Sequence, residues 1–489
     1  MKTLLKSSII CAALTLSLGS CTKDFVKMNT NPNESSAVAP QSLIAPAIYN
    51  VITSNLDRNL RINNEFMQVT VTRNDNREFH RYEVRATETE YMWRNWYLEL
   101  TNIRDIYNKA DEGRQTGYQT YQGIALILDA WVSSLLTDTY GDIPYFESNL
   151  GYTNNNTSPK FDKQEDIYKD LLLKLERANE LLKENVTVES GNAAFDPIYN
   201  SDPAKWRKLG NSLYLRLLLR TSHKTELNSI EKIKEILETN TAEYPIMTIN
   251  EESAALRFTA QEPFLNPFFN TRDIDFNGDK GYSEFFINNM LELGDPRLST
   301  WATEATLGVY AGMQSGYPKG SIPERQSTLQ VTLKNTLMPG IIMTYAELQF
   351  IIAELAERGI VQKDVEQHYK NGVKASIEMW GKTITDAYYD NTKIGLQADD
   401  SQTTRLKKIH LQKYFTLMFT DFQQWFEYRR TGLLDLYTGV ALENDGKMPV
   451  RLSYPLITQS LNKANYDEAV SRMGGDRISN QMWWQIGVN

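Results

Sequence analysis

The spacing of apolar side chains constrains the fold of this 489-residue chain more than any other feature. In several stretches apolar residues recur at intervals of three or four, the spacing that gathers them on one face of an α-helix. The stretches are Ile167, Leu171, Leu175, Ala178 and Leu182; Trp206, Leu209, Leu213 and Leu217; Leu348, Ile351, Ile352 and Leu355; and Val365, Tyr369, Val373 and Ile377. The sequence therefore predicts a mainly α fold.

Capping residues indicate where these helices begin. The candidates are Asp202 ahead of Pro203, Thr344 with Glu347, and Asp162 with Glu165. A capping side chain accepts a hydrogen bond from an N–H group that has no partner in the first helical turn. Only a short turn separates the helix after Thr344 from the next one, which predicts a helical hairpin. No strict 34-residue repeat is visible, so any stack of hairpins is degenerate.

The segment from Thr259 to Pro339 differs in composition from the rest of the chain. Glycines and prolines repeatedly interrupt regular structure there, and aromatic residues are frequent. A long irregular segment inside a helical domain is more often functional than a plain connection. Two interpretations stay open, because the aromatic rings could line a ligand site or could hold the loops against the helices.

The N-terminus resembles a bacterial lipoprotein signal peptide. Lys2 and Lys6 precede a short apolar stretch, and Leu18-Gly19-Ser20-Cys21 resembles the lipobox that lipoprotein signal peptidase cleaves. We expect residues 1–20 to be removed and Cys21 to carry the lipid anchor, with residues 21–40 as a polar tether. The alternative is an ordinary secreted protein with an incidental Cys21. Thr22-Lys23-Asp24 resembles the signal that sends lipoproteins to the exterior face of some outer membranes.

Cysteine content and charge exclude several classes of protein. Cys11 lies in the segment predicted to be removed, so the mature body has no intramolecular disulfide and needs a large core instead. A formal net charge of −9 argues against a nucleic-acid partner, which would favour a basic surface. The 9 Trp and 26 Tyr residues supply rigid faces on which sugar rings could pack.

A series of motifs identifies a family resemblance. In chain order they are Asp138-Thr139-Tyr140-Gly141-Asp142-Ile143-Pro144; Trp206 to Leu213 with Arg216; Asp295-Pro296-Arg297-Leu298; Tyr310-Ala311-Gly312 with Gly320; Met343 to Leu348 with Ala353-Glu354; Gln412-Lys413-Tyr414; Glu427 to Gly432; and Arg451 to Pro455 with Asn462 and Asn465. Together with the lipobox, they resemble the SusD/RagB family of outer-membrane lipoproteins, in particular its SusD-like subfamily. Gln424-Trp425-Phe426-Glu427 departs from the Glu-Ala-Trp that relatives more often carry.

The resemblance implies a scaffold of degenerate tetratricopeptide-like helical hairpins at about 41–258 and 340–432. It implies an irregular ligand-binding region at about 259–339 and 433–489, all within one domain, 21–489. Such proteins bind oligosaccharides, or peptides in some relatives, and deliver them to a SusC-like TonB-dependent transporter. The charged residues of the motifs should be structural, either paired with opposite charges or capping helix ends. They are Asp142, Arg216, Glu347, Glu427 and Arg430.

Catalytic motifs are not found in the sequence. The four histidines show no metal-ligand spacing, and neither a cysteine nucleophile in the mature chain nor a G-x-S-x-G elbow is present. A pair of carboxylates suited to glycoside cleavage could still form in space, because the chain has 61 acidic residues. We predict that the protein is not an enzyme and requires no cofactor.

One segment matches the calcium-loop pattern D-x-[DN]-x-[DN]-G-x5-E. Its oxygen-bearing residues are Asp273, Asp275, Asn277, Asp279 and Glu284. Carboxylate and amide oxygens suit a hard cation such as calcium. Lys280 stands where such loops carry an apolar residue, so the alternative is a polar turn that leads into a helix from Ser283 to Leu293.

Two groups of residues are candidates for the glycan site. The first is Arg81, Tyr82, Trp93 and Trp96, which combines flat rings with a hydrogen-bond donor. Trp93 and Trp96 are three positions apart on a predicted helix, so at least one should belong to the core. The second group is Trp301, Tyr310 and Tyr317 of the irregular region.

Overall fold

Helices make up most of the computed structural model, which describes residues 38–75, 79–335 and 337–487. The predicted signal peptide, Cys21 and nearly all of the tether lie outside these residues. Residues Pro40–Asn489 form one compact unit. The mainly α fold is confirmed. None of the helices in the described ranges is both long enough and apolar enough to cross a membrane.

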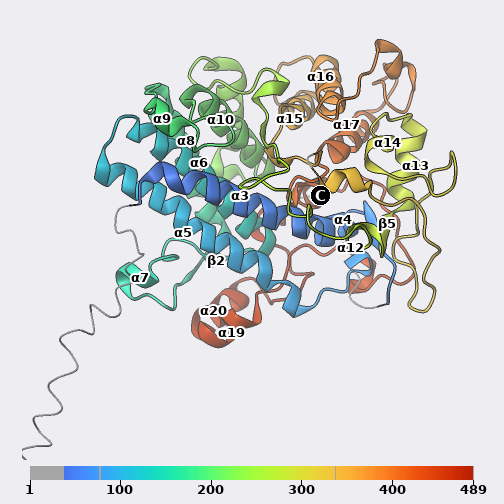
Figure 1. Ribbon diagram of the computed structural model, residues 1–489, viewed down its shortest axis with the longest axis horizontal. Coiled ribbons are helices and arrows are strands. Elements are labelled where there is room, and N and C mark those ends of the chain that lie inside the picture. Colours follow the sequence, from blue (N-terminus) through green and yellow to red (C-terminus); the bar gives the residue numbers. More distant parts are fainter. Residues whose placement is uncertain (1–37, 76–78, 336, 488–489) are drawn as a thin grey trace, which may run out of the picture. The chain divides into compact units, whose positions relative to one another are not determined.

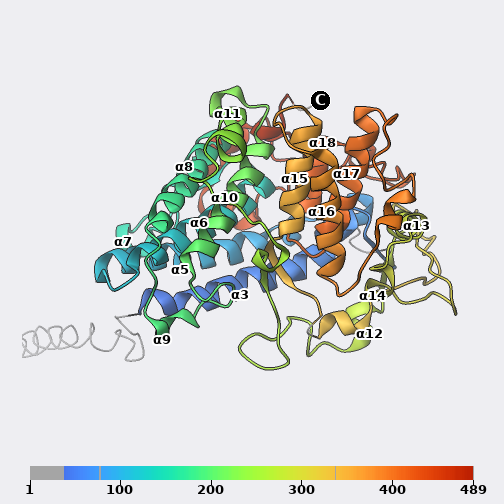
Figure 2. The same ribbon diagram turned by 90° about the horizontal axis from the view of Figure 1, so that it is seen from above.

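Two groups of long helices form the scaffold. In the first group each helix packs on the one before it: α3 (Pro40–Arg58), α5 (Glu90–Gly113), α6 (Tyr118–Tyr140), α8 (Gln164–Lys183) and α10 (Pro203–Arg220). The second group contains α15 (Tyr345–Glu357), α16 (Val365–Glu378), α17 (Gln402–Thr416) and α18 (Gln423–Thr431). Helices α10 and α15 join the two groups, which lie side by side in Figures 1 and 2.

Short helices connect or follow these groups. They are α4 (Asn64–Phe66), α7 (Gly151–Asn154), α9 (Ser190–Ala193), α11 (Ser229–Lys234), α12 (Asp273–Asn277), α13 (Glu284–Leu293), α14 (Leu298–Trp301), α19 (Leu456–Leu461) and α20 (Lys463–Arg472). The helical hairpin predicted after Thr344 is formed by α15 and α16.

The predicted caps are confirmed with one exception. The Asp202 carboxylate accepts from the N–H of Ala204 at 2.9 Å, and Thr344 Oγ1 accepts from the N–H of Glu347 at 3.1 Å. Asp162 instead lies in a short strand and accepts from the N–H groups of Tyr145 and Phe146. Helix α8 begins at Gln164, and Asp162 Oδ2 accepts from the two N–H groups instead of capping this helix.

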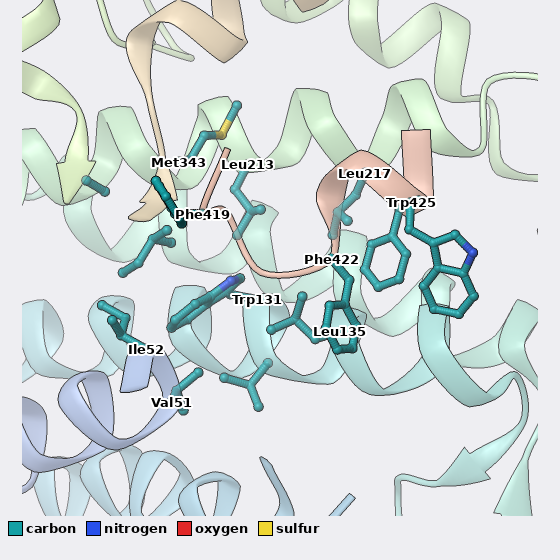
Figure 3. Packing of buried hydrophobic residues seen from close by; sticks show 14 of the residues in the cluster. Val51, Ile52, Trp131, Leu135, Leu213, Leu217, Met343, Phe419, Phe422 and Trp425 are labelled. Atoms are coloured by element: carbon teal, nitrogen blue, oxygen red, sulfur yellow. The ribbon is translucent and has the colours of Figure 1, made fainter. Parts of the chain in front are cut away.

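The centre of the core lies between α3, α6 and α10. Figure 3 shows Val51 and Ile52 of α3 beside Trp131 of α6, with Leu213 of α10 and Phe422 packed above them. All five side chains are at most 1% exposed. Burial of one such side chain contributes roughly 1.5–3 kcal/mol, which replaces the stabilisation that disulfides would otherwise supply.

Three antiparallel strand pairs connect distant parts of the chain. They are β1 (Thr70–Thr72) with β5 (Lys280–Tyr282), β2 (Ile143–Pro144) with β3 (Phe161–Asp162), and β4 (Ala254–Leu256) with β6 (Gly340–Met343). In the first pair Thr72 lies opposite Lys280, and Thr70 lies opposite Tyr282. This pair fixes the irregular region to the segment that follows α3.

The charged residues of the family motifs are buried and paired, as predicted. Arg216 donates from Nε to Glu347 Oε1 at 2.6 Å, and Arg430 Nη1 donates to Glu354 Oε1 at 2.8 Å. The other pairs are Arg430 with Glu427, Arg220 with Asp138, and Arg472 with Asp142. The pairs Arg216–Glu347 and Arg220–Asp138 join helices that are far apart in sequence.

The C-terminal segment packs on the end of α6. The N–H of Leu452 donates to Thr139 O at 2.9 Å, and Arg451 Nε donates to Tyr140 O at 3.1 Å. Helices α19 and α20 follow within the region expected to be irregular. This segment completes the core around the first group of helices.

Candidate functional site

The last turn of α3 continues into a π-helical turn, Asn59–Asn63, that directs two arginines toward a cavity. Such turns are rare and occur frequently at functional sites. Asn59 Nδ2 donates to Asp421 O at 2.6 Å, and Asn63 Nδ2 donates to Gln424 Oε1 at 2.6 Å, so the turn is held from behind. Arg58 and Arg61 are thereby left half-buried at the cavity.

The irregular region forms the opposite wall of this cavity. Phe268 precedes α12, Phe276 lies on α12, and Lys280 begins β5. The rings of Phe268 and Phe276 are 5.5 Å apart and tilted by 50°. The pairing of β5 with β1 holds Lys280 in place, because Thr72 is its partner across the strands.

We call this site the α3–α12 cavity. It has a volume of about 450 Å³, which is within the usual range for small-ligand sites. Its lining residues are Thr53, Asp57, Arg58, Leu60, Arg61, Tyr91, Pro267, Phe268, Thr271, Asp275, Phe276 and Lys280. Aromatic rings, cations and carboxylates therefore converge where the scaffold meets the irregular region.

Ion pairs with Glu88 hold Arg58 and Arg61 at the wall of the cavity. Arg58 Nη1 lies 3.4 Å from Glu88 Oε2, and Arg61 Nη2 lies 3.7 Å from Glu88 Oε1. The guanidinium of Arg58 also lies 4.0 Å from the centre of the Tyr91 ring. A cation over an aromatic ring is attracted by the negative face of that ring, which fixes the orientation of Tyr91.

A buried carboxyl group lies behind the cavity. Glu65 is fully buried and accepts hydrogen bonds from Thr72 Oγ1 and from the N–H of His80. Burial raises the pKa of Glu65, although Arg61 opposes the shift. Burial lowers the pKa of Lys280, and the nearby Glu65 opposes that shift. Both groups are partly deprived of the water that would stabilise their charged forms.

A protein-family comparison decides the identity of the fold. The family model SusD-like_2, described as "Starch-binding associating with outer membrane", matches residues 32–455. The chain belongs to this family. The predicted SusD-like membership is therefore confirmed, and the family description associates its members with starch binding and the outer membrane.

Solved structures share the fold of this SusD-like protein. A chitin-binding SusD homolog from Flavobacterium johnsoniae has a TM-score of 0.80 at 19% identity, covering 92% of this chain and 99% of its own. An outer-membrane protein of Bacteroides vulgatus, described with a role in nutrient binding, has a TM-score of 0.78 at 23% identity, covering 92% and 100%. A protein described as chitin-binding has a TM-score of 0.75 at 26% identity, covering 91% and 99%. No curated protein sequence matches the chain.

Two of the tryptophans predicted for the ligand site belong to the core of this SusD-like chain. Trp96 and Trp301 are 0% exposed. Trp96 Nε1 donates to Asn55 Oδ1 at 2.8 Å, and Trp301 packs edge-on against Trp380 with ring centres 5.2 Å apart. Neither ring presents a face to a ligand here, because helix packing covers both.

Three further predicted residues, Arg81, Tyr82 and Tyr317, are also buried, at 1%, 5% and 2% exposure. The hydroxyl of Tyr317 donates to Thr72 O at 2.8 Å, and its ring stacks on His80 at 4.8 Å. The guanidinium of Arg81 lies over the ring of Tyr317, 5.3 Å from its centre. Arg81 and Tyr317 hold the irregular region against the scaffold, which is the alternative that the sequence left open.

His80 contributes to this contact between the irregular region and the scaffold as a neutral group. Burial, with Arg81 nearby, lowers the pKa of His80 to about 3. The neutral ring can therefore accept at Nδ1, where the N–H of Gly316 donates at 3.0 Å.

Trp93 lies at a second cavity, which we call the Trp93 cavity. Its volume is about 370 Å³, and its residues are Glu90, Trp93, Arg94, Tyr97, Pro144, Ser148, Asn149, Thr157, Pro159, Phe161, Ile457, Thr458, Leu461 and Asn462. Trp93 is 8% exposed and packs edge-on against Tyr140. Tyr91 and Trp93 thus belong to different cavities on two sides of the first turns of α5. Tyr310, the last predicted residue, is half-buried against the core.

The residues of the calcium motif do not converge in the structure. Asp273–Asn277 form α12, where Asp275 pairs with Arg272 at 2.7 Å and Asp273 pairs with Lys334 at 3.0 Å. Gly278 has a right-handed helical backbone and continues the turn. The helix predicted in the alternative interpretation is observed as α13, with Ser283 as its cap. Calcium binding stays a prediction that requires this segment to rearrange.

Within the described residues, one group of acids and histidine lies close enough to hold a metal: Glu354, His410 and Glu427. Cations already occupy it. Arg430 bonds to both carboxylates, and Lys413 Nζ donates to Glu427 Oε2 at 2.6 Å. We assign this cluster to the structure of the scaffold.

Sequence reasoning missed most residues of the α3–α12 cavity. Arg58, Arg61 and Tyr91 were not among the candidates, although Tyr91 is two positions from Trp93. The spacing of Tyr91 and Trp93 indicates that the two rings lie on different faces of the helix, because residues two apart on a helix point in different directions. Only tertiary packing decides which of these faces meets the irregular region.

Proposed function

We propose that this SusD-like protein is a non-catalytic glycan-binding protein that holds an oligosaccharide in the α3–α12 cavity. The observation that carries the proposal is the composition of this cavity, where the partly exposed Tyr91 and Phe268 lie beside Asp57 and Arg58. The C–H faces of sugar rings pack on aromatic rings, and charged side chains pair with sugar hydroxyls. The description of the Flavobacterium johnsoniae neighbour as chitin-binding supports a glycan as the ligand class.

The proposed setting is the exterior face of the outer membrane, with Cys21 as the lipid anchor. The protein would capture oligosaccharides there and deliver them to a SusC-like TonB-dependent transporter. The family description and the predicted lipobox support the location.

The carboxylates of the cavity support a role without catalysis. Glycoside cleavage needs one carboxyl group with a raised pKa as a general acid and a second carboxylate near it. Among the lining carboxylates, hydrogen bonds from Arg272 lower the pKa of Asp275. Burial raises the pKa of Glu65, but this side chain is 0% exposed and does not line the cavity. Asp57 Oδ2 lies 3.5 Å from Arg58 Nε, so a cation attends this carboxylate as well.

Calorimetric titration of the soluble body from Thr22 tests the proposal. The panel contains chito-oligosaccharides, malto-oligosaccharides and oligopeptides, and each mixture is analysed for cleavage products. We expect one glycan class to bind without cleavage. In the Tyr91→Ala variant that affinity should fall about tenfold or more, equal to about 1.4 kcal/mol, because a ring at the cavity is lost.

Tyr118→Ala is a matched control. Tyr118 is half-buried and also has an arginine over its ring, Arg114 at 5.8 Å, but it does not line the cavity. Its removal should leave affinity unchanged. If affinity falls only in the Trp93→Ala variant, the ligand binds in the Trp93 cavity and not in the α3–α12 cavity. Peptide binding alone would replace the proposal with a peptide-binding subunit, and cleavage would overturn the non-catalytic role.

A further inference from the structure

Charged groups around the α3–α12 cavity differ in whether they have partners. Two carboxylates line the cavity, and each has an arginine beside it. Both oxygens of Asp275 accept from Arg272, at 2.7 and 2.8 Å. Asp57 Oδ2 lies 3.5 Å from Arg58 Nε. The two carboxylates that line the cavity, Asp275 and Asp57, therefore already have cationic partners.

The donors of the cavity are less completely satisfied. Lys280 lines the cavity, and among the described residues its Nζ has no hydrogen bond and no ion pair within 4.0 Å. Arg58, by contrast, has ion-pair partners in Asp57 and Glu88. A half-buried donor without a partner costs free energy, which a ligand acceptor can recover.

Glu65 is the nearest candidate to neutralise Lys280, but its position prevents this. Its side chain is fully buried, and its oxygens accept from Thr72 and His80 instead. Burial also raises the pKa of Glu65, which weakens its negative charge. Arg61, 3.8 Å from Glu65, shares that charge. Lys280 therefore faces the cavity beside a carboxyl group that already has other partners.

The balance of the lining charges agrees with this reading. Glu88 pairs with Arg58 and Arg61, so among the described residues Lys280 is the lining cation without an ion pair within 4.0 Å. A neutral sugar offers hydroxyls that each donate and accept, so it would leave the charge of Lys280 unpaired. An acidic group would pair with Lys280 directly, and charge-assisted hydrogen bonds are about twice as strong as neutral ones.

We propose that the α3–α12 cavity selects an acidic sugar residue, whose carboxylate or sulfate pairs with Lys280. This inference rests on the proposed glycan-binding function and narrows the ligand class. Phe268 and Tyr91 would pack on the ring of the same residue. A carboxylate and a sulfate ester share the chemistry that Lys280 requires.

The test compares four probes by calorimetry at low and physiological salt. They are trigalacturonic acid, a sulfated trisaccharide, chitotriose and maltotriose. We expect one acidic probe to bind at least tenfold more tightly than both neutral ones, with the advantage reduced by salt because the ion pair is screened. The carboxylate and sulfate probes separate the two sources of negative charge.

Lys280→Met should abolish the acidic preference while the variant keeps the thermal midpoint of the parent, since no ion pair of the folded protein is removed. The control is Lys393→Met, which removes an exposed lysine paired with Glu292 at 3.0 Å outside the cavity. This control should leave the preference intact.

Each remaining outcome overturns a defined statement. Tighter binding of chitotriose or maltotriose, or an acidic preference that survives Lys280→Met, would overturn the inference and leave the glycan-binding function standing. Binding of oligopeptides with no response to any saccharide would overturn both. Equal binding of all four probes would also reject the acidic preference.

Discussion

Buried charges of the scaffold and charges of the α3–α12 cavity follow opposite rules. In the scaffold Arg216 and Glu347 are each at most 2% exposed and bond to one another in two places. Glu354 similarly accepts from both terminal nitrogens of Arg430. At the cavity Lys280 has no such partner among the described residues. The difference separates charges that complete the fold from a charge that is available to a ligand.

The physical basis of this difference is desolvation. Removing a charge from water costs several kcal/mol, and a complete set of partners recovers that cost only when the geometry is good. The scaffold supplies those partners from helices that fold together. The cavity keeps partial contact with solvent, so an unpaired ammonium is tolerated there until a ligand arrives.

Breaking a scaffold pair should produce the largest effect. Arg216→Met leaves Glu347 buried without its bidentate partner, and we expect the free energy of unfolding to fall by about 3–5 kcal/mol. Chemical denaturation of the soluble body measures this change. Lys463→Met is the control, because Lys463 and Asp467 form an exposed pair. Exposed pairs contribute only about 0–1 kcal/mol. Equal losses in the two variants would contradict the comparison.

Two buried carboxyl groups should respond to pH with opposite signs. Burial alone would raise the pKa of Glu354, but Arg430 and His410 hold it well below the ordinary value. Its stabilising contribution is present above the unfolded pKa of about 4.3 and is lost as the pH falls through the folded pKa. Burial raises the pKa of Glu65, so its contribution is present below about 4.3 and is lost as the pH rises.

We therefore expect the free energy of unfolding of Glu354→Gln to be about 3 kcal/mol lower than that of the parent at pH 7. This free energy should also fall less on acidification than it does in the parent. Glu65→Gln should keep its stability or gain about 1 kcal/mol at pH 7, because an amide can still serve Thr72 and His80. The advantage should shrink toward pH 4. Denaturation curves at several pH values check both variants. A large loss in Glu65→Gln at pH 7 would show that this carboxylate acts as a scaffold charge.

Calcium should produce the smallest effect. The acids of α12 are held by Arg272 and Lys334, and they do not converge on one point. Millimolar calcium should therefore leave the thermal midpoint unchanged, whereas a ligand present at 100 times its Kd would add about 2.7 kcal/mol. Magnesium at the same concentration controls for ionic strength. A rise specific to calcium would show that the segment rearranges into a cation site.

The scaffold was largely predictable because its signals are local. Helical spacing and caps such as Thr344 reappear in the structure, and the expected pairing of Arg216 and Glu347 is observed. The cap at Asp162 was wrong because strand β3 and the N–H of Tyr145 use that side chain. A local pattern cannot reveal a competing partner that is contributed by another segment.

The candidate site was less predictable, since ring exposure is a tertiary property. Trp96 and Trp301 have the chemistry of a sugar platform and are fully covered. Tyr91 stays half-exposed only because the end of α3 and the loop before α12 leave a cavity beside it. The choice among neighbouring aromatics depends on which faces the other elements cover.

By itself, the sequence determined the helices and the family to which the chain belongs. These properties follow from residue type and spacing along the chain. Tertiary structure alone decided which aromatics remain accessible and which charges remain unpaired. Helix packing and the β1–β5 pairing bring Arg58, Tyr91, Phe268 and Lys280 together from four separate segments, and burial then sets their chemistry.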